Sequence, residues 1–467
     1  MRRDATRKQE QQFNSIPSLK EPPIVGSLPF LQRDRYGFLR KVAELGPVAR
    51  CHMGPFPAIV FNRAEYISSL LVEHAKDTDK GFTQHRAFYG NGVIISEGAF
   101  HDRQRRIMAP SFTPRAIAGY ANIMASYGER LAATWTDGQE INLTKALMTL
   151  TTSIVGKALF DDDVFDETSE LGKALVIVFN HAAYMVTHPF APPASWPTRR
   201  NREKDRAWDV IKNRIQVMID KRRAESGQQN SRNDFLSLLM QACDEDGQPM
   251  SDQQLVDECV TLFTGGQETV ANALGWAWYL LCQHPDLYQN VQKEVDCVLK
   301  GKPPTLDDVN RLTLCLQVFK ETLRLYPPAS VIIRQALRDF VLENDQKSRR
   351  YFVKKGTLLL VSLYAVHRDA SLYPEPDTFN PARFTPEVEK ALPRYGFMPF
   401  GAGPRICIGN HFAMLEGPIL LATLAQRVTF ELVPGQQVIP SSETLTTRPV
   451  TDISVIVHRR EKKADLL

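Results

Sequence analysis

The longest regular pattern in this chain of 467 residues is helical and covers residues 251–284. Ser251 and Gln254 are spaced as in an N-terminal capping box, and Pro285 stops the pattern. Apolar residues recur between them at helical spacing, at Leu255, Cys259, Leu262, Val270, Leu274, Trp278 and Leu281. With a rise of about 1.5 Å per residue, the helix would be roughly 50 Å long. Such a helix is long enough to cross the whole molecule.

The other segments predict many helices and a few short strands. Helical patterns dominate residues 64–221, whereas residues 48–53 and 58–61 flank a Gly-Pro turn and predict a β-hairpin. Further strand-like runs lie at residues 330–335, 340–342, 351–353, 357–362 and 453–458. No composition break marks a linker. We therefore expect a mainly α protein with small β-sheets, formed by a single domain at residues 16–467 after a disordered N-terminal segment at residues 1–15.

Charge and cysteine usage exclude several classes of protein. The chain has 57 basic and 53 acidic residues, and a net charge of +4 is too small to indicate nucleic-acid binding. No apolar run approaches the roughly 18 residues of a membrane span. The seven cysteines include no C-x-x-C pair, which favours a reducing compartment over a disulfide framework. We therefore expect a cytoplasmic protein.

One of these cysteines lies in a glycine-rich turn. Residues 400–409 read FGAGPRICIG, with Arg405 two residues before Cys407, and a helical pattern follows at residues 410–424. Glycines allow the backbone to turn tightly and to approach a flat ligand. A neighbouring Arg and a helix N-terminus favour the thiolate, which can serve as an anionic ligand. Taken alone, a buried structural cysteine is the alternative.

The whole turn resembles the haem-binding loop of the cytochrome P-450 superfamily, F-x-x-G-x-R-x-C-x-G, and every specified position is filled. The resemblance implies that Cys407 is the axial ligand of the iron of haem b, as a thiolate that promotes O–O cleavage. It also implies that Phe400, Gly401 and Gly409 belong to the haem-binding site. Because it extends over nearly the whole chain, it implies the cytochrome P-450 fold.

The long helix contains a second motif, which reads GGQET at residues 265–269. Two glycines inside a helix cost about 1 kcal/mol each relative to alanine, so they need a compensating reason. Close helix packing is one such reason. The other is a resemblance to the oxygen-activation motif of the same family, [A/G]-G-x-[D/E]-T. It implies that Gly265 and Gly266 open the helix to make room for dioxygen, and that Glu268 and Thr269 deliver protons for O–O cleavage.

Glu321 and Arg324 share one face of a predicted helix, at i and i+3. A surface salt bridge is the simpler explanation of this pair. Residues 379–384, which include Arg383, resemble the family segment whose arginine joins such a pair in a buried network. The resemblance therefore implies a structural network of Glu321, Arg324 and Arg383.

Four residues match family positions that bind the haem propionates: His101, Arg105, Arg334 and Arg405. Arginine suits this role because it makes charge-assisted, often bidentate bonds to carboxylates. Arg103 and Arg106 are expected to face solvent on the helix of Arg105, where they would attract an acidic electron-transfer partner. A merely solvated basic face is the alternative.

The resemblance implies a haem-thiolate monooxygenase that inserts one oxygen atom from O2 into a lipophilic substrate, a fatty acid or a terpenoid. A ferredoxin or flavodoxin with its reductase would supply the electrons. By the same resemblance, the substrate pocket draws on residues 83–95, 179–196, 263, 329–332 and 445–446. The alternatives are a peroxide-driven haem-thiolate peroxygenase or isomerase that needs no electron partner, and a non-catalytic haem sensor. Glu268 and Thr269 argue against both.

Overall fold

The computed structural model describes residues 16–81, 90–161, 170–187, 191–193, 195–225 and 234–460. Residues 1–15, expected to be disordered, lie outside the described residues. The same holds for residues 83–89, 188–190 and 194 of the segments assigned to the pocket. The chain forms two compact units, which we describe separately. Unit 1 is Met1–Gly81, Lys320–Cys407 and Pro440–Arg448, and unit 2 is Phe82–Phe319, Ile408–Ile439 and Pro449–Leu467. The single domain at residues 16–467 stays a prediction.

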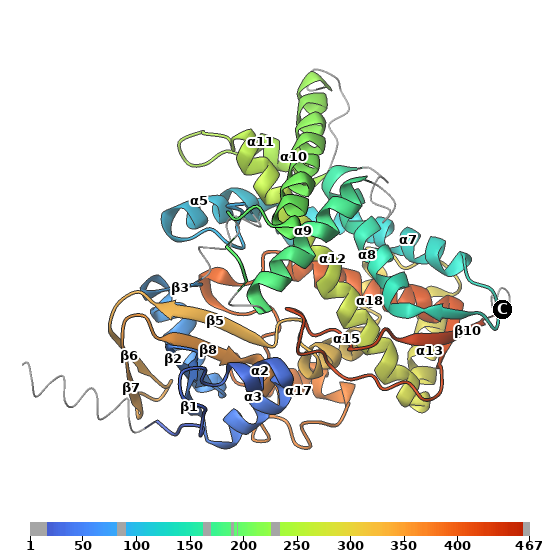
Figure 1. Ribbon diagram of the computed structural model, residues 1–467. Helices are drawn as coiled ribbons and strands as arrows, with labels where there is room; N and C mark the ends of the chain where they lie inside the picture. The colour runs from blue at the N-terminus through green and yellow to red at the C-terminus, as the bar shows by residue number, and fades with distance from the viewer. Residues whose placement is uncertain are drawn as a thin grey trace, which may run out of the picture. The chain divides into compact units, whose positions relative to one another are not determined.

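Unit 1 is organised around a five-stranded sheet with the strand order β1-β2-β8-β5-β3 (Figure 1). β1 and β2 form the predicted antiparallel hairpin, β2 pairs with β8 in parallel, and β5 pairs with β8 in antiparallel. β6 and β7 form a separate two-stranded sheet. The strands are β1 (Val48–Met53), β2 (Phe56–Phe61), β3 (Thr78–Asp79), β5 (Val331–Ala336), β6 (Phe340–Glu343), β7 (Arg350–Val353) and β8 (Leu358–Ser362).

The two faces of this sheet bury different clusters, as the two-residue period of a strand requires. Ile59 and Phe61 of β2 belong to one buried cluster. Ala58 and Val60 point to the other face and join a second cluster with Leu39 of α3. The helices of unit 1 are α2 (Leu28–Arg33), α3 (Arg35–Glu44), α16 (Leu363–Val366) and α17 (Pro386–Ala391), with short turns η1 (Ala64–Tyr66), η2 (Ser69–Glu73), η3 (Ala75–Asp77), η7 (Pro381–Phe384) and η8 (Gly403–Arg405). The turn η2 is π-helical.

Unit 2 is mainly helical, and α12 (Asp252–Gln283) is its longest helix. Its other helices are α5 (Gly98–Met108), α6 (Pro114–Ile117), α7 (Ala121–Ala133), α8 (Leu143–Phe160), α9 (Glu170–Thr187), α10 (Arg199–Glu225), α11 (Phe235–Gln241), α13 (Pro285–Leu299), α14 (Leu306–Val309) and α18 (Asn410–Arg427), with turns η5 (Ala109–Phe112) and η6 (Ala118–Tyr120). The helix α15 (Thr313–Leu325) begins in unit 2 and ends in unit 1. A three-stranded sheet has the order β4-β10-β9, with β4 (Glu140–Asn142), β9 (Val428–Leu432) and β10 (Ser454–Arg459).

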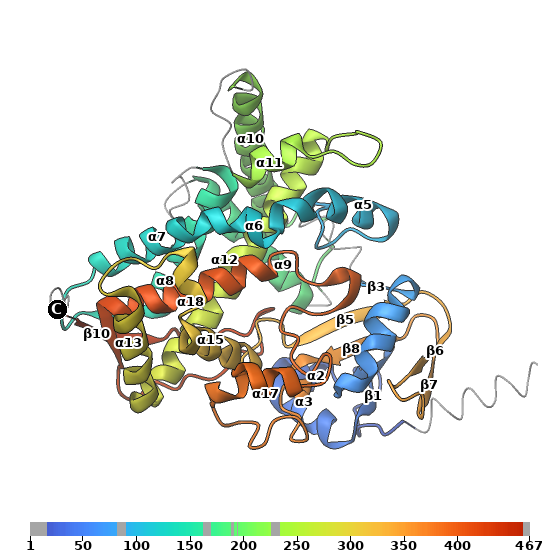
Figure 2. The same cartoon turned by 180° about the vertical axis from the view of Figure 1, so that it is seen from behind.

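Close contacts between helices shape unit 2. A Cβ atom on Gly128 of α7 would lie 3.0 Å from the Thr423 side chain of α18, and Figure 2 shows these helices side by side. The hydroxyl of Thr151 on α8 donates a hydrogen bond of 2.7 Å to the Gln267 carbonyl of α12. Because most of α12 is buried, its polar groups must find partners within the protein.

The structure confirms most of the expected elements. The Ser251 side chain accepts a hydrogen bond from the Gln254 N–H at 3.2 Å, and Pro285 occupies the first turn of α13. The strands β5 to β8 and β10 lie within two residues of their predicted positions. Sequence patterns missed β3, β4 and β9, which are two to five residues long.

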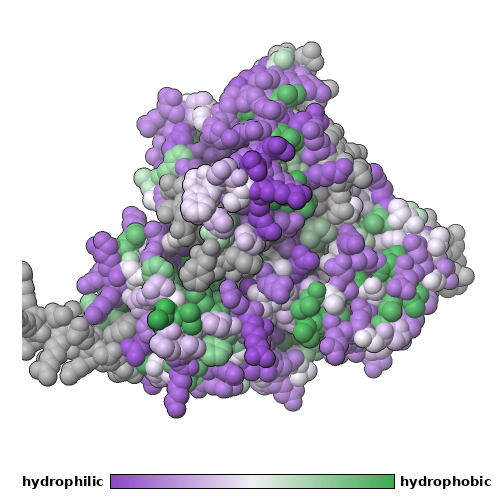
Figure 3. All heavy atoms as spheres, in the orientation of Figure 1, coloured by the Kyte–Doolittle hydropathy of each residue, from purple (hydrophilic) through white to green (hydrophobic). Residues whose placement is uncertain are grey.

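Among the described residues, no helix has both the length and the apolar character needed to cross a membrane. The outward side of α10 is largely hydrophilic (Figure 3) and exposes charged side chains such as those of Arg206, Lys212 and Lys221.

Candidate haem-thiolate site

The cysteine loop of unit 1 is a tight turn that requires its glycines. Gly401 and Gly403 have φ angles of 76° and 70°, in the left-handed region that favours glycine. A Cβ atom on Gly403 would lie 2.0 Å from the Leu71 carbonyl oxygen, so no larger residue fits there. The Cys407 N–H donates to the Phe400 carbonyl at 2.9 Å and closes the loop. The chain therefore presents Cys407 at a defined point of a rigid turn.

The state of the thiols supports Cys407 as the ligand. Cys51, Cys259 and Cys315 are buried, and burial raises the pKa of each. Cys282 donates to the Phe430 carbonyl at 3.2 Å, and burial raises its pKa to about 12. Cys407 is exposed, and it lies in a turn whose glycines at positions 401 and 403 have positive φ angles. Cys243 and Cys297 are also exposed, but they lie outside such a turn.

Other residues of unit 1 flank this loop. A Cβ atom on Gly401 would lie 3.4 Å from the Ile332 side chain, so the loop lies against β5. Arg334, two residues further along β5, is buried and donates a hydrogen bond of 2.8 Å to the Ile333 carbonyl. Arg405 is half-buried in η8. Unit 1 therefore holds Cys407 together with two of the four predicted propionate partners.

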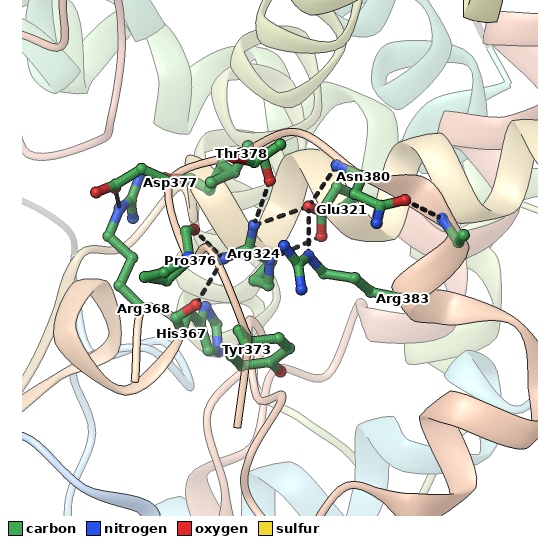
Figure 4. A network of polar contacts seen from close by, with 12 residues as sticks. Glu321, Arg324, His367, Arg368, Tyr373, Pro376, Asp377, Thr378, Asn380 and Arg383 are labelled. Atoms are coloured by element: carbon green, nitrogen blue, oxygen red, sulfur yellow. Dashed lines mark hydrogen bonds and ion pairs between the residues drawn. The ribbon is translucent and has the colours of Figure 1, made fainter. Parts of the chain in front are cut away.

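A buried ionic network lies in the same unit (Figure 4). The Arg324 guanidinium donates two hydrogen bonds of 2.7 Å to the two carboxylate oxygens of Glu321, and both side chains are completely buried. Arg383 approaches the same carboxylate at 3.5 Å, and the Asn380 N–H donates to it at 2.9 Å. A surface salt bridge, the simpler alternative, is therefore wrong, because the pair is a buried node.

The remaining donors of Arg324 connect this node to the cysteine loop. One guanidinium nitrogen donates to the carbonyls of His367 and Pro376, at 2.8 and 2.6 Å (Figure 4). The Nε2 atom of His367 accepts a hydrogen bond from the Met398 N–H at 3.0 Å, and the Met398 carbonyl accepts one from the Gly401 N–H. Burial, with the charges of Arg324 and Arg368, lowers the pKa of His367 to about 3. His367 is therefore a neutral acceptor that links the network to the turn of Cys407.

In unit 2, the two glycines of α12 have different surroundings. A Cβ atom on Gly266 would lie 2.8 Å from the Val155 side chain of α8, so close helix packing explains this glycine. Among the described residues, a Cβ atom on Gly265 would have no atom within 4 Å apart from its chain neighbours and the backbone of its own helix. The helix remains α-helical through both residues. The packing alternative therefore accounts for one of the two glycines.

The acid and the alcohol follow on the same helix. The Thr269 hydroxyl donates a hydrogen bond of 2.8 Å to the Gly265 carbonyl, one turn earlier. Glu268 is buried, with 3% of its surface exposed. A hydroxyl held in this way has a fixed oxygen that can still accept a proton or a hydrogen bond. This arrangement suits the proton delivery that the motif implies.

The helix α5 holds the other two predicted propionate partners. His101 is buried, and its Nδ1 atom lies 3.0 Å from the Asp102 carboxylate. Arg105 is half-buried one turn later. Both belong to unit 2, whereas Arg334 and Arg405 belong to unit 1.

The expectation that Arg103 and Arg106 face solvent is wrong for Arg103. Its side chain is 34% exposed and pairs with Asp244 at 2.7 Å. Arg106 is exposed, but it pairs with Glu245 at 2.8 Å. Because both positive charges have acidic partners within the chain, they attract an acidic protein less strongly than free arginines would.

Comparisons with known proteins identify the family of this chain. The model of the family described as Cytochrome P450 matches residues 16–456. Cyclooctatin synthase of Streptomyces melanosporofaciens is 34% identical over 92% of this chain and 93% of its own length. Pentalenene oxygenase of Streptomyces avermitilis is 30% identical over 90% of this chain and 92% of its own length. The crystal structure of a cytochrome P450DA heme domain superposes with a TM-score of 0.84 at 25% identity, over 96% of this chain and 98% of that one. The chain therefore belongs to the cytochrome P-450 family of monooxygenases, which bind haem b through a cysteine thiolate.

Proposed function

We propose that this protein hydroxylates a lipophilic terpenoid, using O2 and electrons from a separate redox partner. Its relatives include cyclooctatin synthase and two terpenoid oxygenases, cyclooctat-9-en-7-ol 5-monooxygenase and pentalenene oxygenase. The observation that carries the monooxygenase assignment is the hydroxyl of Thr269, held on the Gly265 carbonyl beside buried Glu268. A fatty acid is the second substrate class, and the family relationship alone supports it.

The residues of the cysteine loop fit a bound haem. The rigid turn presents the exposed Cys407 thiol, and Arg405 places a positive charge two residues away, which favours the thiolate. Arg105, Arg334, Arg405 and His101 would hold the propionates through charge-assisted hydrogen bonds. When bound, haem supplies the activation of O2 that no side chain can provide.

The residues of α12 manage protons in this proposal. Glu268 exchanges protons between the protein interior and the Thr269 hydroxyl, which accepts a proton on its oxygen and passes its own proton on when it turns away from the Gly265 carbonyl. The bond to the Gly265 carbonyl holds the hydroxyl oxygen at one point. Proton supply then depends on a group of fixed position rather than on diffusing water.

A ferredoxin or flavodoxin with its reductase is the proposed electron source. The acid–alcohol pair favours this route over a peroxide-driven one. An enzyme that receives hydrogen peroxide does not need to deliver protons to reduced O2 in order to form it. Docking on Arg103 and Arg106 has little support from charge, since Asp244 and Glu245 neutralise both. A cytoplasmic location stays a prediction from the cysteine usage.

Two measurements test the proposal. Cyclic terpenes and alcohols should shift the purified haem protein from low spin to high spin at lower concentrations than fatty acids of similar carbon number. Product should then form with reduced ferredoxin and O2, and far more slowly with hydrogen peroxide alone. Faster turnover with peroxide would establish the peroxygenase alternative, and a preference for fatty acids would reject the terpenoid.

A further inference from the structure

Two consecutive carboxylates on the first half of α12 bind the backbone of a distant turn. Asp257 accepts a hydrogen bond from the Asn91 N–H, and Glu258 accepts one from the Val93 N–H, each at 2.8 Å. Glu258 is completely buried and Asp257 is 5% exposed. Both carboxylates are therefore shielded from water and bind backbone N–H groups of a single turn instead. Neither has a role in the proposed reaction.

Glycines at residues 90 and 92 make this approach possible. A Cβ atom on Gly90 would lie 2.2 Å from an Asp257 carboxylate oxygen, and Gly90 has a φ angle of 65°. A Cβ atom on Gly92 would lie 2.1 Å from the Thr261 hydroxyl and 2.6 Å from the Asp257 carbonyl oxygen. The turn lies so close to α12 that only residues without a side chain fit at both positions.

Further bonds orient the two carboxylates. The other oxygen of Glu258 accepts from the Gln254 amide at 2.8 Å, and the other oxygen of Asp257 accepts from the Gln253 amide at 2.8 Å. Each carboxylate thus has one bond to its own helix and one to the turn. A carboxylate held on both oxygens has little freedom to leave its donor.

The turn leads directly into α5. The N–H groups of Ile95 and Ser96 both donate to the Gly92 carbonyl at 2.9 Å, and α5 begins at Gly98. α5 carries Arg105, whereas α12 carries Glu268 and Thr269 about ten residues after the clamped site. A fixed turn therefore sets where α5 starts relative to α12.

We propose that Asp257 and Glu258 form a carboxylate clamp that positions α5, and with it the haem-binding Arg105, against α12. The clamp acts through backbone N–H groups, so any residue with a suitable acceptor at these positions could maintain it. The consequence for haem rests on the proposed function, because it assumes that Arg105 holds a propionate. The clamp itself does not depend on that role.

The clamp should weaken as the pH rises, because its two acids have raised pKa values. Burial raises the pKa of Glu258 to about 7 and also raises that of Asp257, while Lys212 of α10 lowers the pKa of Asp257. An open turn would expose Glu258, whose pKa would return toward its ordinary value of 4.5. The open state then binds fewer protons, so raising the pH from 5 to 7 favours opening. Asp257, beside Glu258, adds to the repulsion once both are ionised.

Hydrogen–deuterium exchange of the peptide covering residues 90–97, corrected for intrinsic rates, tests the clamp in the holoprotein. Asp257→Ala and Glu258→Ala should each raise this exchange at least tenfold. Asp257→Asn and Glu258→Gln keep an acceptor oxygen and should restore most of the protection. Protection in the parent protein should fall between pH 5 and 7, and it should fall less in Glu258→Gln, where only Asp257 still titrates. Asp252→Ala is the matched control, since Asp252 lies on the same helix but binds Arg223 of α10.

Haem transfer to apomyoglobin tests the consequence. Asp257→Ala and Glu258→Ala should lose haem several-fold faster than the parent protein. The amide variants and Asp252→Ala should lose it at the parent rate. Asp257 is slightly more exposed than Glu258, so Asp257→Ala is the variant expected to fold more readily. Unchanged exchange in Asp257→Ala would overturn the clamp. Raised exchange with unchanged haem loss would overturn the positioning of α5. Normal haem retention in Arg105→Ala would instead reject the proposed role of Arg105 and leave the exchange result to decide the clamp.

Discussion

Replacing Glu321 by alanine should cost much of the stability of unit 1, because this carboxylate is the centre of a completely buried node. The substitution removes both hydrogen bonds to Arg324, the bond from the Asn380 N–H and the ion pair with Arg383. Arg324 keeps its bonds to backbone carbonyls, but its charge loses the carboxylate with which it pairs.

The expected loss is about 3–5 kcal/mol, the usual result of breaking a buried ion pair by removing one partner. Since domains have about 5–15 kcal/mol of stability in total, such a loss lowers the yield of folded holoprotein. The ion pair between the neighbouring Lys320 and Glu389 provides a matched control, tested by Glu389→Ala. Lys320 pairs with Glu389 at 2.6 Å in a partly exposed site, where removal of the acid should cost about 0–1 kcal/mol.

The assay is urea unfolding of holoprotein, followed by tryptophan fluorescence and by the haem spectrum, for the parent, Glu321→Ala and Glu389→Ala. We expect a large drop in the midpoint for Glu321→Ala and little change for Glu389→Ala. Equal midpoints for the two variants would refute the reasoning. A change confined to the haem spectrum would mean that Glu321 acts on the cofactor and not on the fold.

Three further outcomes are expected. Cys407→Ser should abolish the strongly red-shifted Soret band of the reduced, CO-bound protein, whereas Cys297→Ser, at another exposed thiol, should keep it; a retained band in Cys407→Ser would reject the ligand assignment. Thr269→Ala should bind substrate normally but form less product and more hydrogen peroxide per reducing equivalent, and an unchanged ratio would show that its hydroxyl serves only the helix. Burial holds the pKa of Glu416 well above its ordinary value, so ionisation opposes folding as the pH rises above about 4.5. Glu416→Gln should therefore gain stability over the parent by up to about 1.4 kcal/mol per pH unit in urea titrations at pH 5, 6 and 7, and a pH-independent difference would contradict the buried acid.

The sequence predicted those features whose signals are local. The cap of α12 needs only Ser251, Gln254 and the proline after the helix, and the strands that flank Gly54 carry the pattern of a hairpin. The cysteine loop is equally local, because its glycines, Arg405 and Cys407 lie within ten residues.

Features that depend on distant partners could not be predicted in this way. Asp257 and Glu258 look like ordinary helix-surface acids, and only the fold brings them to Asn91 and Val93, 166 and 165 residues away in sequence. Likewise, Arg103 looked solvent-exposed because its partner, Asp244, is 141 residues away.

The role of His367 was missed for a different reason. His367 is buried and hydrogen-bonded in the structure. What the pattern could not give is the direction of that bond, from the Met398 N–H to the imidazole. The link between the ionic network and the cysteine loop therefore depends on the three-dimensional fold and not on a local sequence pattern.

The different surroundings of Gly265 and Gly266 have a consequence for directed evolution. A methyl group at position 266 would collide with Val155, so a larger residue fits there only if Val155 is replaced by a smaller residue at the same time. A methyl group at position 265 meets no described residue outside its own stretch of helix, and alanine in a helix is favoured over glycine by about 1 kcal/mol. A library that varies position 265 over small residues, with position 266 held constant, would change the space beside the acid–alcohol pair in steps of one methyl group while the contact between α8 and α12 stays intact.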